Sequence, residues 1–328
     1  MPDPNHIALL QINGSSPVYL RPLEGDIFME LLLECWDVLV IAILRGGLYA
    51  LMAVGLSLVF GVMNIPNFAH GELYMFGAYT AYFAYTVFHI GPIPSILAAG
   101  ILAFVLGMIL EKGVFYPLRK RSKRQWVMNT FLVTLGMSII LQNLAKLSWG
   151  STYHGITQYW QGRVRWLSSI AISMDRVVGF LIAVAVITTF FFFMKKTQTG
   201  RAIRAVSQDE TGASLVGIDL NFIHTLTFAL SAMLAGIAGA CLLSINPAYP
   251  TMGLNPLYKS WFVAILVGMG NVGASIIGGL IVGLLETITY FYFGGGWQDV
   301  ISLSIIILIL LFKPRGLFGV KGVKTALE

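Results

Sequence analysis

Charged residues are scarce in this chain of 328 residues. Asp, Glu, Lys and Arg make up 11% of the sequence, where soluble globular proteins carry about 25%. Hydrophobic residues make up 57%, and the mean hydropathy is +0.79. This composition excludes a soluble enzyme and a disordered protein. It is typical of a protein that crosses a membrane several times.

Cysteine is nearly absent, since the chain has only Cys35 and Cys241. Two distant cysteines exclude a disulfide scaffold, and without a CxxC or Cys/His cluster they predict no metal site. No Ser/His/Asp arrangement is visible, and no G-x-x-x-x-G-K-[ST] segment occurs. We therefore predict that the chain binds no cofactor and hydrolyses no ATP itself.

Apolar segments of transmembrane length recur along the chain. A membrane helix needs about 20 apolar residues, and the pattern predicts an all-α polytopic bundle of about eight such helices. The apolar region 257–290 is interrupted at Gly268–Asn271 and predicts a short helix, a break and a longer helix, as either two crossings or a re-entrant pair. The seven continuous spans are 38–62, 68–89, 93–113, 127–147, 176–194, 222–245 and 298–312.

The two ends of the chain lack these long apolar segments. Residues 1–35 contain four prolines and form a separate extension, which makes Met29 a candidate native start. Residues 36–319 form the membrane domain, and residues 320–328 form a short tail.

Basic residues are concentrated in three segments. Fourteen of the 21 lysines and arginines lie in 112–124, 195–204 and 313–324. Because cytoplasmic loops are enriched in Lys and Arg, we predict these segments and the C-terminus to be cytoplasmic and the N-terminus to be external. Arg163 and Arg165 in an external loop run against this pattern. The net charge of +6 thus reflects membrane topology, and the predicted partner is lipid rather than nucleic acid.

Residues Gly268–Gly273 match the dinucleotide pattern G-x-G-x-x-G. That motif requires a preceding strand and an acidic residue about 20 positions on, whereas the flanks here are membrane-length apolar runs. We interpret the segment as a helix break followed by close packing, because small residues recur every four positions, a pattern of helix contacts in membranes. The two series are Ser275, Gly279, Gly283 and Ala232, Gly236, Ala240.

A polar segment, Asn64-Ile-Pro-Asn-Phe-Ala-His-Gly-Glu72, interrupts the apolar run 46–88. Pro66 breaks a helix, and Asn67 is a good N-cap for the next one. A helix N-terminus at membrane depth suits a carboxylate, so we predict a substrate pathway here; the alternative is a polar turn at the cytoplasmic membrane edge. The predicted pathway residues of the two breaks are Asn64, Asn67, His70, Glu72, Gly268, Gly270 and Asn271.

The charged linker 195–221 is too long for a simple turn. Ser207-Gln-Asp-Glu210 matches a capping box and Gly217 a helix stop, which together predict one helix over 208–216. Ala213 and Val216 would give it a small apolar face. A helix this short is marginal in water, so we expect it to dock on a cytoplasmic partner; the alternative is a solvated connector.

Three segments carry a family resemblance. The stretch 47–75, with its Asn-Phe-Ala-His-Gly-Glu core, resembles the opening of the LivH-type permeases of branched-chain amino acid ABC importers. The linker 200–218 is similar to their cytoplasmic loop, and the ending 312–319 is similar to their C-terminus. Residues 1–35 have no counterpart in this resemblance.

The resemblance implies a subunit of a larger machine in a bacterial or archaeal inner membrane. Its expected partners are a second, LivM-like permease, two cytoplasmic ATPases that use ATP and magnesium, and a periplasmic or lipid-anchored binding protein. The loop would be the coupling helix, although Glu210 is followed by Thr and Gly where importers carry Ala-Ala. The residues implied in ATPase coupling are Arg201, Arg204, Ser207, Asp209, Glu210, Ala213, Val216 and Gly217.

Other functions stay open at this point. Related permeases carry urea, amides or other small organic acids, and a permease sequence does not decide among these substrates. An ATP-independent secondary transporter would also be a Gly-rich bundle with broken helices, but it would need no docking helix.

Overall fold

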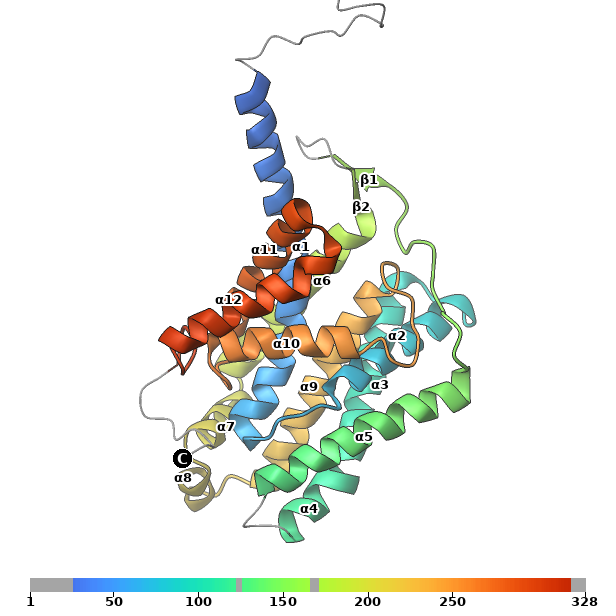
Figure 1. Ribbon diagram of the computed structural model, residues 1–328. Helices are drawn as coiled ribbons and strands as arrows, with labels where there is room; N and C mark the ends of the chain where they lie inside the picture. The colour runs from blue at the N-terminus through green and yellow to red at the C-terminus, as the bar shows by residue number, and fades with distance from the viewer. Residues whose placement is uncertain (1–25, 122–125, 166–170, 320–328) are drawn as a thin grey trace, which may run out of the picture.

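The computed structural model describes residues 26–121, 126–165 and 171–319 as a bundle of α-helices (Figure 1). Within these ranges seven helical segments are long and apolar enough to cross a membrane, which confirms the polytopic all-α prediction. Five are single helices: α1 (Asp26–Met63), α5 (Trp126–Trp149), α6 (Met174–Lys196), α9 (Leu220–Leu242) and α11 (Ala274–Phe293).

The other two membrane-length segments are composite. In the first, α3 (Pro92–Leu110) continues through a π-helical turn, Glu111–Phe115, into α4 (Tyr116–Arg121). In the second, a 3₁₀ turn, Gly295–Trp297, leads into α12 (Gln298–Phe312). Helix α1 is longer than predicted, because it begins inside the expected extension; residues 1–25 of that extension and the tail 320–328 lie outside the described residues.

Two further helices are shorter than the seven membrane-length segments. Helix α10 (Leu254–Val267) has 14 residues, so it is roughly 21 Å long at 1.5 Å per residue, less than a hydrocarbon core of about 30 Å. Helix α2 (His70–Thr86) has 17 residues and is shorter than the span predicted over 68–89. The interrupted region therefore consists of a short α10, which lies across the bundle in Figure 1, and a membrane-length α11.

The remaining elements lie at the two ends of the bundle. Helices α7 (Gln198–Gln208) and α8 (Glu210–Leu215) follow α6, and two short antiparallel strands, β1 (Arg163–Val164) and β2 (Ile172–Ser173), precede it. Figure 1 places α4, α7 and α8 at one end, which we call the basic end. The strands and the start of α1 lie at the opposite, far end.

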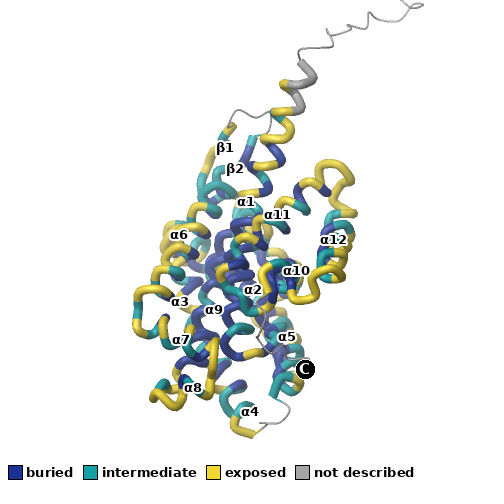
Figure 2. Tube along the Cα trace, turned by 90° about the vertical axis from the view of Figure 1, so that its left-hand side faces the viewer, coloured by how far each residue is buried: buried dark blue, intermediate teal, exposed yellow. Residues whose placement is uncertain are grey.

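Helix α9 forms the centre of the bundle, as the dark tube in Figure 2 shows. Glycines allow close approach there, because a Cβ on Gly77 of α2 would lie 2.2 Å from the Gly236 carbonyl oxygen. Likewise, a Cβ on Gly283 of α11 would lie 2.6 Å from Cα of Gly46 on α1. Both series of small residues thus make the predicted helix contacts.

The outer helices expose apolar side chains. Examples are Leu97 and Ile101 on α3 and Leu308 and Leu311 on α12. Figure 2 shows α12 as mostly exposed or half-buried. In water such surfaces would be unfavourable, whereas lipid tails cover them without cost.

Candidate functional site

The first predicted helix break is present between α1 and α2. Helix α1 ends at Met63, and Asn64 has a positive φ of 53°. The prediction that Asn67 caps the next helix is wrong. Its side-chain oxygen accepts a 3.1 Å hydrogen bond from the Ala69 amide, and Ala69 occupies the N-cap of α2 without a side-chain bond. Helix α2 therefore begins two residues later than predicted, and Asn67 stabilises the turn that precedes it.

Aromatic side chains hold the broken segment against two neighbouring helices. The ring of Phe68 stacks on Trp261 of α10 with centroids 5.4 Å apart, and it meets Phe131 of α5 edge-on at 5.3 Å. The indole nitrogen of Trp126, at the start of α5, donates to the Met63 carbonyl at 3.4 Å. Both α5 and α10 therefore contact the broken segment directly.

The two ionisable residues after the break are fully buried. His70 lies 3.1 Å from the Met52 carbonyl oxygen and 3.3 Å from the Ser231 hydroxyl, which ties α2 to α1 and α9. One carboxylate oxygen of Glu72 accepts hydrogen bonds from two residues of α5, Ser138 at 2.9 Å and Gln142 at 2.7 Å. Its other oxygen is buried without a hydrogen-bond partner in the part of the chain that the structure describes. Buried polar groups of this kind fix helix positions because an unmade bond is costly.

The N-termini of the two short helices meet inside the bundle. A Cβ on Gly71, in the first turn of α2, would lie 2.5 Å from the carbonyl oxygen of Gly253. Gly253 is the N-cap of α10, and a Cβ there would lie 2.1 Å from the Gly71 carbonyl oxygen. The partial positive charges at the N-termini of α2 and α10 therefore lie in the same region of the bundle. No local sequence signal indicates this pairing.

The second predicted break, between α10 and α11, is also present. Gly268 and Gly270 have positive φ values of 101° and 85°. The side-chain oxygen of Asn271, two residues before the N-cap Gly273, accepts from the Ala274 amide, and its amide nitrogen donates to the Phe318 carbonyl at 3.3 Å. This break therefore holds the C-terminal segment at the basic end.

The two breaks lie next to each other. A Cβ on Gly61, in the last turn of α1, would lie 2.7 Å from the Gly270 carbonyl oxygen. The predicted pathway residues of the two breaks thus adjoin at the end of α1, whereas His70 lies about two to three turns deeper, beside Met52 and Gly55. Their part in substrate passage stays a prediction.

The charged linker contains two helices where one was predicted. Ser207 lies in the last turn of α7 and donates to the Arg204 carbonyl, so it does not cap a helix, and the predicted capping box is wrong. Thr197 caps α7 instead, accepting from the Gly200 amide at 2.9 Å. Asp209 is extended and separates α7 from α8. The helix stop is confirmed, because Gly217 has a φ of 88° and the Ile218 amide donates to the Ala213 carbonyl.

Two exposed apolar side chains end α8. Leu215 is 83% exposed and Val216 is 79% exposed, whereas Ala213 is buried against the bundle. The predicted apolar face of Ala213 and Val216 is therefore divided: one side chain anchors α8 and the other points away. The predicted coupling residues Arg201, Arg204, Ser207, Asp209, Glu210 and Gly217 are all exposed.

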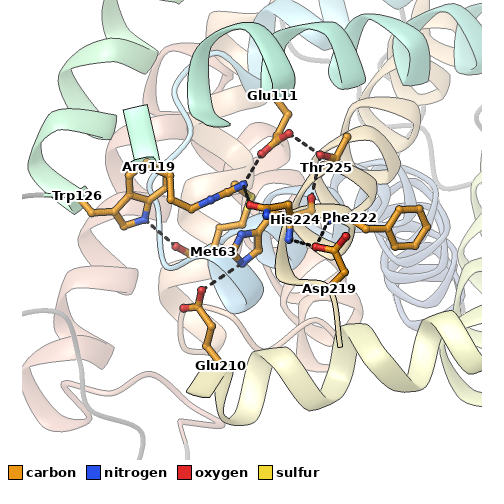
Figure 3. Close-up of polar contacts among 10 residues, drawn as sticks. Met63, Glu111, Arg119, Trp126, Glu210, Asp219, Phe222, His224 and Thr225 are labelled. Atoms are coloured by element: carbon orange, nitrogen blue, oxygen red, sulfur yellow. Dashed lines mark hydrogen bonds and ion pairs between the residues drawn. The ribbon is translucent and has the colours of Figure 1, made fainter. Parts of the chain in front are cut away.

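A cluster of polar residues connects α8 to the membrane helices (Figure 3). Glu210 of α8 lies 3.8 Å from the imidazole of His224 on α9. One residue further along α9, Thr225 donates to the buried carboxylate of Glu111 at 2.5 Å, and Arg119 donates to the same carboxylate at 3.1 Å. Arg119 lies 5.9 Å from the Trp126 ring centroid, and Trp126 contacts the end of α1 as described. Contacts thus run from α8 to the first break.

A second buried network was missed in the sequence. Lys259 on α10 is 3% exposed and forms ion pairs with Glu286 of α11 and Asp299 of α12. Glu286 also accepts from Tyr49 at 2.8 Å and from Gln298 at 2.6 Å. The carboxylate of Glu286 is fully buried. Asp299 lies in the first turn of α12, where an acidic side chain interacts favourably with the helix dipole.

Comparison with known proteins identifies the family. Residues 38–310 match the family described as "Branched-chain amino acid transport system / permease component". The chain belongs to this permease family. No solved structure matches the chain.

Curated relatives cover most of the permease. The branched-chain amino acid permease BraD of Pseudomonas aeruginosa is 31% identical over 84% of this chain and 92% of its own length. LivH of Escherichia coli is 32% identical with the same coverage. A probable LivH of Methanocaldococcus jannaschii is 28% identical over 85% of this chain and 91% of its own. The permease is thus a multi-pass membrane transport subunit and not an enzyme.

Proposed function

We propose that the permease imports branched-chain amino acids across the inner membrane by alternating access, driven by separate ATPase subunits. The curated relatives carry this substrate class in their names. In this arrangement the basic end faces the cytoplasm, in keeping with the enrichment of Lys and Arg there. A second permease subunit and a substrate-binding protein complete the machine.

The proposal is supported mainly by the two faces of α7 and α8, one buried against the bundle and one exposed. Their inner side chains, including Ile203, Val206 and Ala213, are buried against the bundle. Their outer surface presents Leu215 and Val216 beside charged residues. An apolar centre with a polar rim is the usual composition of a protein interface. We infer that an ATPase docks here.

The contacts in Figure 3 supply a route for coupling. Glu210 of α8 faces His224 on α9 at 3.8 Å, so a displacement of α8 would change the surroundings of α9. Because Arg119 and Trp126 connect the neighbouring helices to Met63, the displacement reaches the break between α1 and α2. Closure of the ATPases would in this way change access to the pathway at the basic end.

Reconstitution tests the proposal. The permease, its partner permease and the ATPases are placed in proteoliposomes with the binding protein, and uptake of radiolabelled leucine is measured with ATP, without ATP, and with an imposed proton or sodium gradient. We expect uptake with ATP only. Uptake driven by an ion gradient in the absence of ATP would show a secondary transporter and contradict the proposal.

A further inference from the structure

A cavity of about 270 Å³ lies among α1, α6, the end of α9 and the start of α12. These elements meet at the far end of the bundle, away from α7 and α8 (Figure 1). Pockets for drug-sized ligands have roughly 300–1,000 Å³, so this cavity suits a smaller molecule. Neither the predicted pathway residues nor the docking surface contributes to it.

Two arginines line the cavity, Arg45 from α1 and Arg176 from α6. Both are half-buried. Within the described residues, neither forms an ion pair with a carboxylate, and one guanidinium nitrogen of Arg45 is buried without a hydrogen-bond partner. The guanidinium group of Arg45 lies over the ring of Tyr290, 5.4 Å from the ring centroid. Two like charges beside one cavity repel each other unless an anion joins them.

Glu286, whose carboxylate contacts two residues of the cavity lining, is already paired. Glu286 accepts from Tyr49 and Gln298, both of which line the cavity, and it pairs with Lys259. Its charge is thereby matched by a cation of its own. No acidic side chain is among the described residues that line the cavity, so both arginines are available to an anionic ligand.

The rest of the lining restricts the ligand further. Leu44, Leu48, Leu242 and Ile245 form an apolar wall, which favours an aliphatic group. Asn246 and Gln298 contribute side-chain amide oxygens that can accept from an ammonium group. Guanidinium groups bind carboxylates with paired hydrogen bonds.

We propose that this cavity binds the carboxylate of an aliphatic amino acid through Arg45 and Arg176 as the substrate enters the permease. The inference rests on the proposed function and deepens it, because it places a requirement for a carboxylate in the permease itself. Leucine satisfies all three parts of the lining. Urea and amides, which lack the carboxylate, leave the arginines unpaired.

Cysteine labelling measures ligand binding in the cavity and does not depend on transport. The assembled complex in nanodiscs carries Cys35→Ser, which removes the exposed cysteine and leaves the buried Cys241, together with Ile245→Cys in the cavity wall. We expect leucine at ten times its dissociation constant to slow maleimide labelling about tenfold, and leucinamide to have no effect. Tyr153→Cys, 72% exposed and outside the cavity, serves as the unprotected control.

Arginine variants in this background test the two side chains. Arg45→Gln and Arg176→Gln should each weaken protection by leucine about tenfold, the usual scale for a lost charged hydrogen bond. Arg45→Lys should retain part of it, and Arg163→Gln, an exposed arginine on β1, should retain all of it. Size-exclusion profiles confirm that each complex remains assembled.

Three outcomes would overturn the inference: equal protection by leucinamide, full protection in both Gln variants, or labelling that responds to phosphatidylglycerol in the nanodisc but not to leucine. ATP-driven leucine uptake by the wild-type complex separates the two proposals. Uptake without protection refutes the cavity alone, whereas the absence of uptake refutes the proposed function.

Discussion

Gln142 of α5 donates a 2.7 Å hydrogen bond to the buried carboxylate of Glu72 on α2. This bond and the neighbouring one from Ser138 attach α5 to the short helix that follows the first break. Because α5 begins at Trp126, which contacts the end of α1, one helix holds both sides of the break. The bundle around 63–72 is thus a connected unit and not a loose polar turn.

Replacement of Glu72 distinguishes its hydrogen-bonding role from its charge. In Glu72→Gln the amide oxygen can still accept from Ser138 and Gln142, so we expect near-normal stability. In Glu72→Leu both donors lose their acceptor, and we expect a loss of about 1–3 kcal/mol in the free energy of unfolding. Denaturant unfolding in detergent measures both, with Glu34→Gln, an exposed position, as control. Equal loss in both variants would show that the charge itself is required.

The approach of Gly71 and Gly253 gives a second prediction. A methyl group on either residue would overlap the other's carbonyl, so Gly71→Ala and Gly253→Ala should each cost about 1–3 kcal/mol, the usual scale for overpacking, and should lower transport. Gly113→Ala and Gly136→Ala are matched controls, because a Cβ at those positions has no neighbour within 4 Å. Thermal unfolding of all four variants checks this. Normal stability of Gly71→Ala would contradict the close contact of α2 and α10.

The ion pair of Glu111 and Arg119 predicts a non-additive effect. Arg119→Ala leaves the carboxylate of Glu111 buried without its cation, which costs about 3–5 kcal/mol. Adding Glu111→Gln removes the unpaired charge, so the double variant should be more stable than Arg119→Ala alone. Arg121→Ala, an exposed arginine on the same helix, should be neutral. A double variant less stable than Arg119→Ala would refute the pairing.

Features encoded by neighbouring residues were predictable from the sequence. Pro66 and the Gly268–Gly270 pair indicated both helix breaks, because proline and positive-φ glycine end helices within a few residues. The spacing of Gly279 and Gly283 indicated the packing of α11, which here faces α1. Gly217 indicated the end of α8.

Features that depend on distant residues were not predictable. Lys259 and Asp299 are 40 positions apart, and nothing local marks them as an ion pair. Ser207 matches a capping box, but Thr197 begins the helix ten residues earlier and places Ser207 in its last turn. The cavity at Arg45 and Arg176 forms only when α1 and α6 meet at the far end.

Docking of the ATPases at α8 is tested most directly by replacing its two exposed apolar residues. We expect Leu215→Ser with Val216→Ser to weaken ATPase association in pull-down about tenfold, since truncating an interface anchor costs over about 1 kcal/mol, and to lower ATP-driven leucine uptake accordingly. Leu147→Ser on α5, where the leucine is also 83% exposed, should leave both unchanged. Wild-type association and uptake in the α8 variant would contradict the coupling of ATP hydrolysis through this helix.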